Sequence, residues 1–299
     1  METPLCPLGH LVPTAELRRR GFGPRALAAL RRDPRCSQPR RGWYACAHLA
    51  PDELLAASCG ARIDCVSALR ARGVWIGDAR GALHLRLPAS GGRTAQRSAG
   101  LRRRVVVHWR KRAGHGSPLY VSTSDALRQA MQCLPPDDLV AAIESAVHLG
   151  RISKPQARRL VASAPHRLAG VLGEIDPEFR AQSGYETKVR LRFRRLGYRV
   201  EPQAAVPGVG HLDNLIEGVI AVETDGRDHD TSRSTDYFRD LWTAAWGIRV
   251  LRVDPALVDR DWPAIQGVVE QIVAEARLLR RLRGRDLDGA PRRRRGHAD

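Results

Sequence analysis

The sequence contains no run of about 18 apolar residues, so it offers no candidate helix for crossing a membrane. Its first residues, METPLCPLGHLVP, also lack the basic segment and the long apolar core of a secretory signal. From these two absences we expect a cytoplasmic protein without a membrane partner. The length of 299 residues allows two or three domains, each with its own core.

Acidic residues and lysine are both scarce. The chain has 32 acidic against 50 basic residues, only three of them lysine, and its formal net charge is +18. Such an excess of positive charge attracts polyanions over long range, and nucleic acid is the leading candidate partner. A GC-rich genome also favours arginine, but exchanging arginine for lysine would leave the charge unchanged. The alternative is a solvated surface or a basic tail.

Cysteine is sparse and irregularly spaced, at positions 6, 36, 46, 59, 65 and 133. This pattern lacks the density of a disulfide framework, and in a reducing compartment we expect free thiols. Cys6 with His10, and Cys36 with Cys46, could together supply zinc ligands. No CxxC pair is present, however, so the sequence favours free cysteines over a zinc site.

The first 47 residues predict two short helices followed by a hairpin. PTAELRRRG ends on Gly21, GPRALAALRRD places Pro24 in a first turn, and RCSQPRRGWYAC is typical of a basic hairpin. This is the order of a winged helix-turn-helix domain, whose second helix enters the major groove of DNA. A small helical domain with solvated arginines is the alternative. We expect DNA contacts from Arg25, Arg31, Arg32, Arg40 and Arg41.

The segment TAELRRRGFGPRALAALRRDPRCSQPRRGWYA resembles the N-terminal winged-helix domain of the AbiEi-type antitoxin family, in which a Gly-Trp/Val-Tyr signature ends the wing. The resemblance implies that residues 48–175 form the middle α/β domain of such proteins. ALHLRLP and RRVVVHW predict its strands. Its helices are predicted to be capped by Ser122 or Ser124 and interrupted at Pro135 and Pro136.

Residues 176–282 alternate between helical and apolar extended segments in the order αβββαβα. This alternation predicts a central mixed sheet covered by helices on both faces. Residues 283–299 combine Gly, Pro and four consecutive arginines without an apolar face, so we expect a basic disordered tail. The expected fold class is therefore α+β, with domains at 1–47, 48–175 and 176–282.

Carboxylates gather at the end of the strand predicted over VIAVETDG. Glu223 and Asp225 are two residues apart, so their side chains point to one face. Asp213 lies on the preceding strand and shares that face only if the connecting loop has an odd number of residues. In that case we expect Asp213 diagonal to Glu223, at about 7–8 Å between backbones. A slip of one residue in the pairing would separate them.

Three carboxylates on one face repel one another unless a cation binds or one of them is protonated. Oxygen ligands suit Mg²⁺ or Mn²⁺, which can activate water toward a phosphodiester, and we take Asp213 and Glu223 as the metal ligands. Hydrogen bonds and arginine partners are the alternative compensation. Glu186 could complete the site from the preceding helix, but it also fits a capping box with Ser183. His229 could act as a general acid or base.

The segments SGYETKVRLRFRRLGYRV, HLDNLIEGVIAVETDGRDH and DYFRDLWTAAWGIRVLRVD resemble the Vsr-like endonuclease-domain family of the restriction-endonuclease-like PD-(D/E)xK superfamily. The resemblance covers about residues 183–254. It implies that Asp213 and Glu223 are the paired metal-binding acids. It also implies that Asp225 stands at the superfamily's lysine position and that His229 is the histidine of this branch.

In the following helix, Asp236 and Arg239 match the family's acidic and basic residues, which implies an ion pair or a phosphate contact there. The sequence departs from the pattern at Asn214, where an apolar or aromatic residue is common, and at the additional Asp228. Neither departure removes a key acid. Without the lysine, the metal, His229 or an arginine such as Arg227 would have to stabilise the transition-state charge.

Three functions follow from these patterns. The first is a DNA-binding protein with a metal-dependent endonuclease domain that hydrolyses DNA phosphodiesters, and the complete set of acids favours it. The second is an antitoxin-like transcriptional regulator with a non-catalytic nuclease-like domain and a toxin partner. The third is a repair or defence factor acting on damaged, mismatched or foreign DNA, suggested by analogy alone. Cutting both strands in one encounter would require a homodimer.

Overall fold

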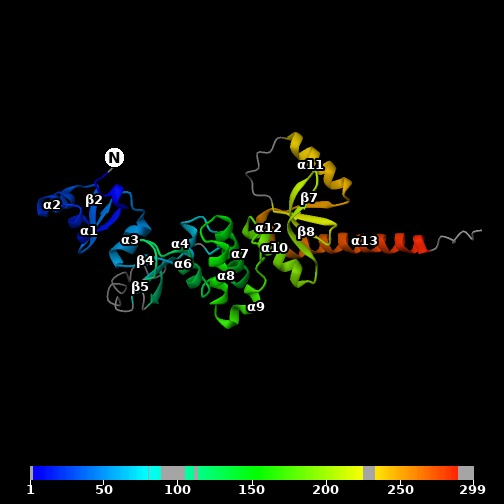
Figure 1. Ribbon diagram of the computed structural model, residues 1–299, viewed down its shortest axis with the longest axis horizontal. Coiled ribbons are helices and arrows are strands. Elements are labelled where there is room, and N and C mark those ends of the chain that lie inside the picture. The colour runs from blue at the N-terminus through cyan, green and yellow to red at the C-terminus, as the bar shows by residue number, and fades with distance from the viewer. Residues whose placement is uncertain (1–2, 80, 89–104, 111–113, 225–232, 289–299) are drawn as a thin grey trace, which may run out of the picture. The chain divides into compact units, whose positions relative to one another are not determined.

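The computed structural model describes residues 3–79, 81–88, 105–110, 114–224 and 233–288. They form an α+β protein that divides into two compact units, Met1–Phe179 and Arg180–Asp299 (Figure 1). The first unit spans the segments 1–47 and 48–175, and the second begins four residues after the predicted boundary. Within the residues described, no helix combines the length and apolar composition needed to cross a bilayer.

The chain begins with a short 3-10 helix and a three-stranded antiparallel sheet in the order β1-β3-β2. The elements are η1 (Cys6–Leu8), β1 (Leu11–Pro13), α1 (Thr14–Arg19), α2 (Pro24–Arg32), β2 (Cys36–Arg40) and β3 (Trp43–Cys46). The predicted two helices and hairpin are confirmed, and Pro24 is in the first turn of α2. The sequence analysis missed β1, because its three residues form a strand only by pairing with β3, about 30 residues later.

The rest of the first unit contains a second small sheet, in the order β4-β5-β6, and a group of helices. The elements are α3 (Pro51–Cys59), β4 (Arg62–Ile63), α4 (Cys65–Arg70), β5 (Leu83–Pro88), β6 (Val105–Arg110), α6 (Thr123–Ala130), α7 (Pro136–His148), α8 (Lys154–Ala162), η3 (His166–Leu168) and α9 (Ala169–Leu172). Ser122 caps α6 by accepting a hydrogen bond from the backbone N–H of Asp125, and Pro136 opens α7. Both helix starts agree with the sequence prediction.

The second unit is built on one four-stranded mixed sheet in the order β10-β9-β8-β7. Its elements are α10 (Gly184–Arg195), β7 (Val200–Val206), β8 (Gly210–Ile216), β9 (Ile220–Glu223), α11 (Arg233–Ala245), β10 (Arg249–Arg252), α12 (Pro255–Arg260) and α13 (Trp262–Asp288). Strands β7, β8 and β9 are antiparallel neighbours, and β10 runs parallel to β9 after the crossover through α11. The predicted αβββαβ order is therefore present, with α12 added.

Helices cover this sheet on both faces. Val189 and Phe193 of α10 pack with Ile220 of β9 and with Val269 and Val273 of α13 in one apolar cluster, so α10 and α13 share a face. Figure 1 shows α11 on the side of the strands opposite to α13. Of the acids predicted for the site, Asp213 lies in the middle of β8, Glu223 at the end of β9 and Glu186 in the first turn of α10.

Helix α13 is longer than the sequence analysis expected. It runs to Asp288, so residues 283–288, which were assigned to the tail, are helical. The prediction failed because this segment, RGRDLD, contains a glycine and two aspartates, while the helix preceding it carries strong helix formers up to Leu282. Residues 289–299 lie outside the part of the chain that the structure describes.

Candidate functional site

The hairpin between β8 and β9 decides whether the predicted acids share a face. Ile216 pairs with Ile220 across a three-residue loop, and the antiparallel register continues along both strands. Because side chains alternate between faces, this register turns Asp213 and Glu223 to the same side of the sheet. The odd-numbered loop that the site requires is therefore present.

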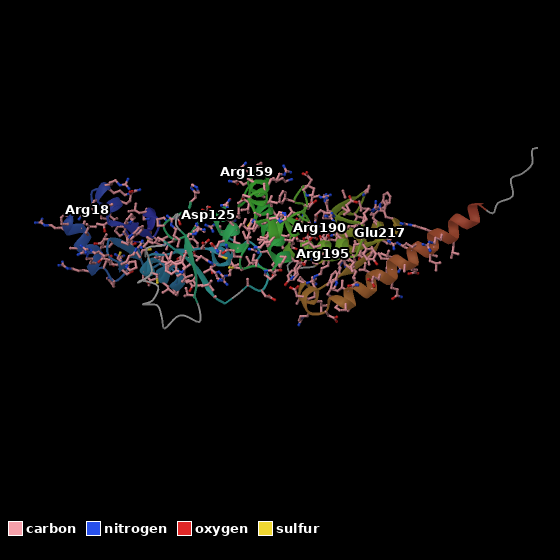
Figure 2. The ribbon with its side chains drawn as sticks, turned by 90° about the horizontal axis from the view of Figure 1, so that it is seen from below. Arg18, Asp125, Arg159, Arg190, Arg195 and Glu217 are labelled. Carbon is pink, nitrogen blue, oxygen red and sulfur yellow. The ribbon has the colours of Figure 1, made fainter. Side chains whose placement is uncertain are left out.

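The register also corrects one detail of the prediction. The ladder runs to Asn214 opposite Val222, and one further step in the same register places Asp213 opposite Glu223, not diagonal to it. Two consecutive loop residues, Glu217 and Gly218, have positive φ angles of 52° and 69°, which lets so short a loop reverse the chain. The Glu217 carboxylate, labelled in Figure 2, accepts a hydrogen bond from the backbone N–H of Arg199 at 3.0 Å. This bond fixes the hairpin against the start of β7.

Gln203 joins two of the acids. Its side-chain NH₂ group donates to Glu186 Oε2 at 2.8 Å and to Asp213 Oδ1 at 3.2 Å. Gln203 has a φ of 48°, a left-handed conformation that is costly for a residue with a side chain. Gln203 was not predicted as a site residue, although a glutamine within the strand VEPQAAV was an available signal. Strained backbone of this kind concentrates at functional sites.

Glu186 combines a capping role with a place in the acidic site. The Ser183 hydroxyl accepts a hydrogen bond from the Glu186 N–H, as the predicted capping box requires. The carboxylate, however, accepts from the backbone N–H of Gln182 at 2.9 Å, and its second bond goes to Gln203. The residue is only 6% exposed. Burial, together with the negative charge of Asp213, raises the pKa of Glu186 to about 7.

Glu223 and Asp213 both have protein partners. Glu223 is buried, and its carboxylate pairs with Arg239 of α11 at 2.5 Å and with Arg252 of β10 at 3.6 Å. The Asp213 carboxylate accepts from the backbone N–H of Thr224 at 3.0 Å. The ion pair implied for Arg239 is thus present, with Glu223 as its partner. Arginine side chains therefore compensate the buried negative charge of Glu223, which is the alternative to a metal ion given above.

The site nevertheless contains oxygen atoms of the kind that bind hard divalent cations. Glu186 and Asp213 approach closely enough to share one NH₂ group, and like charges at such a distance are relieved by a cation. Thr224 Oγ1 is buried beside them, without a hydrogen-bond partner among the residues described. Carboxylate and hydroxyl oxygens are ligands of Mg²⁺ and Mn²⁺. Such an ion would lie between the middle of β8 and the end of β9.

Five residues that the sequence analysis named for this site lie wholly or partly outside the described part of the structure. Asp225 and His229 lie outside the residues that the structure describes, as do Arg227 and Asp228. The backbone of Asp236 belongs to α11, but its side chain is not described. The site that can be described therefore consists of Glu186, Gln203, Asp213, Glu223 and Arg239.

The predicted DNA-contacting arginines of α2 divide into two groups. Leu27 and Leu30 bury one side of the helix. Arg25 and Arg32 are exposed and seven residues apart, so they lie on one face. Arg31 is also exposed, but its Nε donates to the Tyr44 hydroxyl at 2.9 Å and so links α2 to β3. Arg25 and Arg32 are the pair that α2 presents to solvent.

The two hairpin arginines also differ. Arg41, in the turn between β2 and β3, is exposed. Arg40 is half-buried, its guanidinium lies 4.6 Å from the centre of the Trp43 ring, and burial lowers its pKa. Its Nε is buried without a partner among the residues described. Arg18 of α1, labelled in Figure 2, is an exposed arginine that the sequence analysis did not single out.

No protein-family model and no curated protein matches this chain. A solved structure, "Crystal structure of RV2827C protein from Mycobacterium tuberculosis", is 18% identical over 60% of this chain and 76% of its own, with a TM-score of 0.29. A likeness this weak establishes neither a shared fold nor a shared function. The function of this chain therefore has to be inferred from its own residues.

Proposed function

We propose that this chain is a DNA-binding protein whose second unit hydrolyses DNA phosphodiesters with the help of Mg²⁺ or Mn²⁺. The observation that carries the proposal is the convergence of Glu186 and Asp213 on the Gln203 amide, with Glu223 on the same face of the hairpin as Asp213. One helix, three antiparallel strands, a crossover helix and a parallel fourth strand support a restriction-endonuclease-like, Vsr-like fold. The cytoplasm, where genomic DNA is accessible, is the compartment that we propose.

In this proposal Asp213 and Glu223 hold the metal, and Glu186 adjoins them. A bound divalent cation supplies positive charge that stabilises the negative charge developing on the phosphate. Glu186, with a pKa of about 7, can take up or release a proton near neutral pH, as a general base must. Asp225 and His229 remain proposed catalytic residues. Arg239 is close enough to the acids to contact a phosphate of bound DNA.

For the first unit we propose a winged helix-turn-helix that contacts duplex DNA. Arg25 and Arg32 on the exposed face of α2 would lie at the major groove, and Arg41 would contact the backbone from the wing. The net charge of +18 supports attraction to phosphates. Arg31 and Arg40 serve mainly to hold this surface together, because each already has an aromatic partner.

One observation favours the second function, an antitoxin-like regulator with a toxin partner. The Glu223 carboxylate is neutralised by Arg239 and approached by Arg252, so this acid does not need a metal to remain buried. In that case the acids would be structural, and the second unit would bind DNA or a partner protein without cutting.

Nicking of supercoiled plasmid separates the two functions. We would compare the wild-type protein with Asp213→Asn and Glu223→Gln in Mg²⁺, Mn²⁺ or EDTA. Glu275→Gln is the matched control, because Glu275 is an exposed acid of α13 paired with Arg249, outside the acidic site. Metal-dependent nicking that both site variants lose and the control retains supports the nuclease. Salt-dependent DNA binding without cleavage in any metal supports the regulator. Linear product formed in one encounter would indicate a homodimer.

A further inference from the structure

Four side chains with the chemistry of zinc ligands meet near the start of the chain. They are Cys6, His10, Cys46 and His48, and their ligand atoms all lie within 4.8 Å of one another. His10 Nδ1 is 3.0 Å from Cys46 Sγ, and His48 Nδ1 is 3.2 Å from Cys6 Sγ and 3.7 Å from Cys46 Sγ. A tetrahedral zinc ion with Zn–S near 2.3 Å and Zn–N near 2.0–2.1 Å separates its ligand atoms by about 3.3–3.8 Å. The observed spacing is close to that geometry.

The backbone is arranged to bring two short sequence pairs, Cys6-x₃-His10 and Cys46-x-His48, into contact. Strand β1 pairs with β3, and the Cys46 N–H donates to the His10 carbonyl at 2.9 Å. Between η1 and β1 the chain turns through Gly9 and His10, with φ angles of 97° and 66°. A left-handed histidine is uncommon, and here it turns the ring toward Cys46.

The sulfur atoms also have the neighbours expected of zinc-bound thiolates. The backbone N–H and the hydroxyl of Thr3 each lie 3.2 Å from Cys6 Sγ. The backbone of His48 hydrogen-bonds to Cys46. Polar neighbours of this kind orient and stabilise the ligands of a metal.

We propose that Cys6, His10, Cys46 and His48 bind one Zn²⁺ as a Cys₂His₂ structural site. Four protein ligands leave no open coordination position for a substrate, so the ion would stabilise the fold and would not take part in cleavage. Its effect would be to tie η1 and β1 to the end of β3, beside the apolar core that contains Leu5, Val12 and Tyr44. The sequence analysis paired Cys46 with Cys36, and the structure supplies His48 in place of Cys36.

A second cluster of the same composition lies elsewhere in the first unit. Cys65, His84, His108 and Cys133 also have their ligand atoms within 4.8 Å of one another. His108 Nε2 is 3.0 Å from His84 Nδ1 and 3.9 Å from Cys133 Sγ, while the Gln129 side chain lies 3.0 Å from His108 Nδ1. These four residues are different from those of the first cluster, and from them we infer a second Cys₂His₂ zinc site.

Metal analysis of the full-length protein, purified under reducing conditions without chelator, tests both sites. We expect two zinc ions per chain in the wild type and one in each of Cys6→Ser/His48→Ala and Cys65→Ser/Cys133→Ser. Cys36→Ser is the matched control, because Cys36 lies opposite Cys46 in the β2–β3 ladder but outside the cluster, and it should keep two. Unchanged zinc in a cluster variant, or loss of zinc in Cys36→Ser, overturns the corresponding ligand set.

Cobalt substitution of the wild type keeps the test decisive if a variant does not fold. Two equivalents of Co²⁺ should give thiolate-to-metal charge-transfer bands and the visible bands of tetrahedral cobalt, and Zn²⁺ should displace them. A protein without zinc that also binds no Co²⁺ overturns the proposal, as does a Cys6–Cys46 disulfide found by counting thiols. Either result leaves the nuclease proposal untouched, because the acidic site lies in the other unit.

Discussion

The Gln203 side chain lies between two carboxylates and donates from one nitrogen to both, at 2.8 Å to Glu186 and at 3.2 Å to Asp213. An amide is neutral, so it satisfies the acceptors without removing the repulsion between the acids. That repulsion, added to burial, is the reason that Glu186 holds its proton to about pH 7. The protonation state of Glu186 is therefore linked to whether a cation is bound at the site.

Replacing Gln203 by alanine should destabilise the second unit. The buried Glu186 carboxylate and the half-buried Asp213 carboxylate would each lose a hydrogen bond, and we expect the free energy of unfolding to fall by about 1–3 kcal/mol. Denaturant unfolding of Gln203→Ala measures this change. Gln38→Ala is the control, because Gln38 is an exposed strand residue of β2, and it should change stability by less than about 0.5 kcal/mol. Equal effects of the two substitutions would show that the bridge contributes nothing.

The stability of the metal-free protein should depend on pH through Glu186. Its pKa is raised from 4.5 to about 7 in the folded state, so the folded protein binds the proton more tightly than the unfolded chain. The stabilisation is fully present below about pH 4.5 and is lost as pH rises through 7. It should reach at most about 3 kcal/mol. Unfolding in EDTA between pH 5 and 8 should show this decline in the wild type, with a flatter profile in Glu186→Gln. Parallel profiles would exclude Glu186 as the source.

Local sequence signals were sufficient for most of the elements. Ser122 and Ser183 mark helix starts by their capping hydroxyls, and Pro24 and Pro136 by their fixed φ, and each acts within one turn of its own position. Short apolar segments between turn residues likewise predicted the strands β7, β8 and β9. The face shared by Asp213 and Glu223 could be stated only as a condition on loop length, because register depends on a turn that the sequence leaves open.

What the sequence could not provide depends on contacts between distant segments. Gln203 acquires its role from a left-handed backbone within a paired strand, which no local pattern requires. His48 reaches Cys6 because β1 pairs with β3, and a three-residue strand has no signal of its own. Arg40 was predicted to contact DNA because it lies in a basic hairpin, but its guanidinium packs over the neighbouring Trp43 ring.

Removing two exposed arginines from α2 should weaken DNA binding without affecting the fold. If Arg25 and Arg32 each contact a phosphate, Arg25→Ala/Arg32→Ala should lower the slope of log K against log salt by about 2. Titration of duplex DNA at several salt concentrations measures the slope. Arg159→Ala, at an exposed arginine of α8 (Figure 2), is the control with one charge removed elsewhere. A variant slope equal to that of the wild type would remove α2 from the DNA interface.

Arg239 provides the test that bears most directly on whether the acidic site binds a metal. Arg239→Met should remove from the buried Glu223 carboxylate an arginine partner that lies closer than Arg252, and we expect the free energy of unfolding to fall by an amount on the order of 2–3 kcal/mol in EDTA. The loss is smaller than for a fully buried pair because about a third of the Arg239 side chain is exposed. If the acids bind Mg²⁺, the cation can replace the missing positive charge, so Mg²⁺ should raise the melting temperature of Arg239→Met more than that of the wild type. Arg277→Met, which removes an exposed partner of Glu217, should show no such difference. Melting temperatures that do not respond to Mg²⁺ in any of the three proteins would indicate that arginine, and not a metal, neutralises Glu223, and the regulator would become the better proposal.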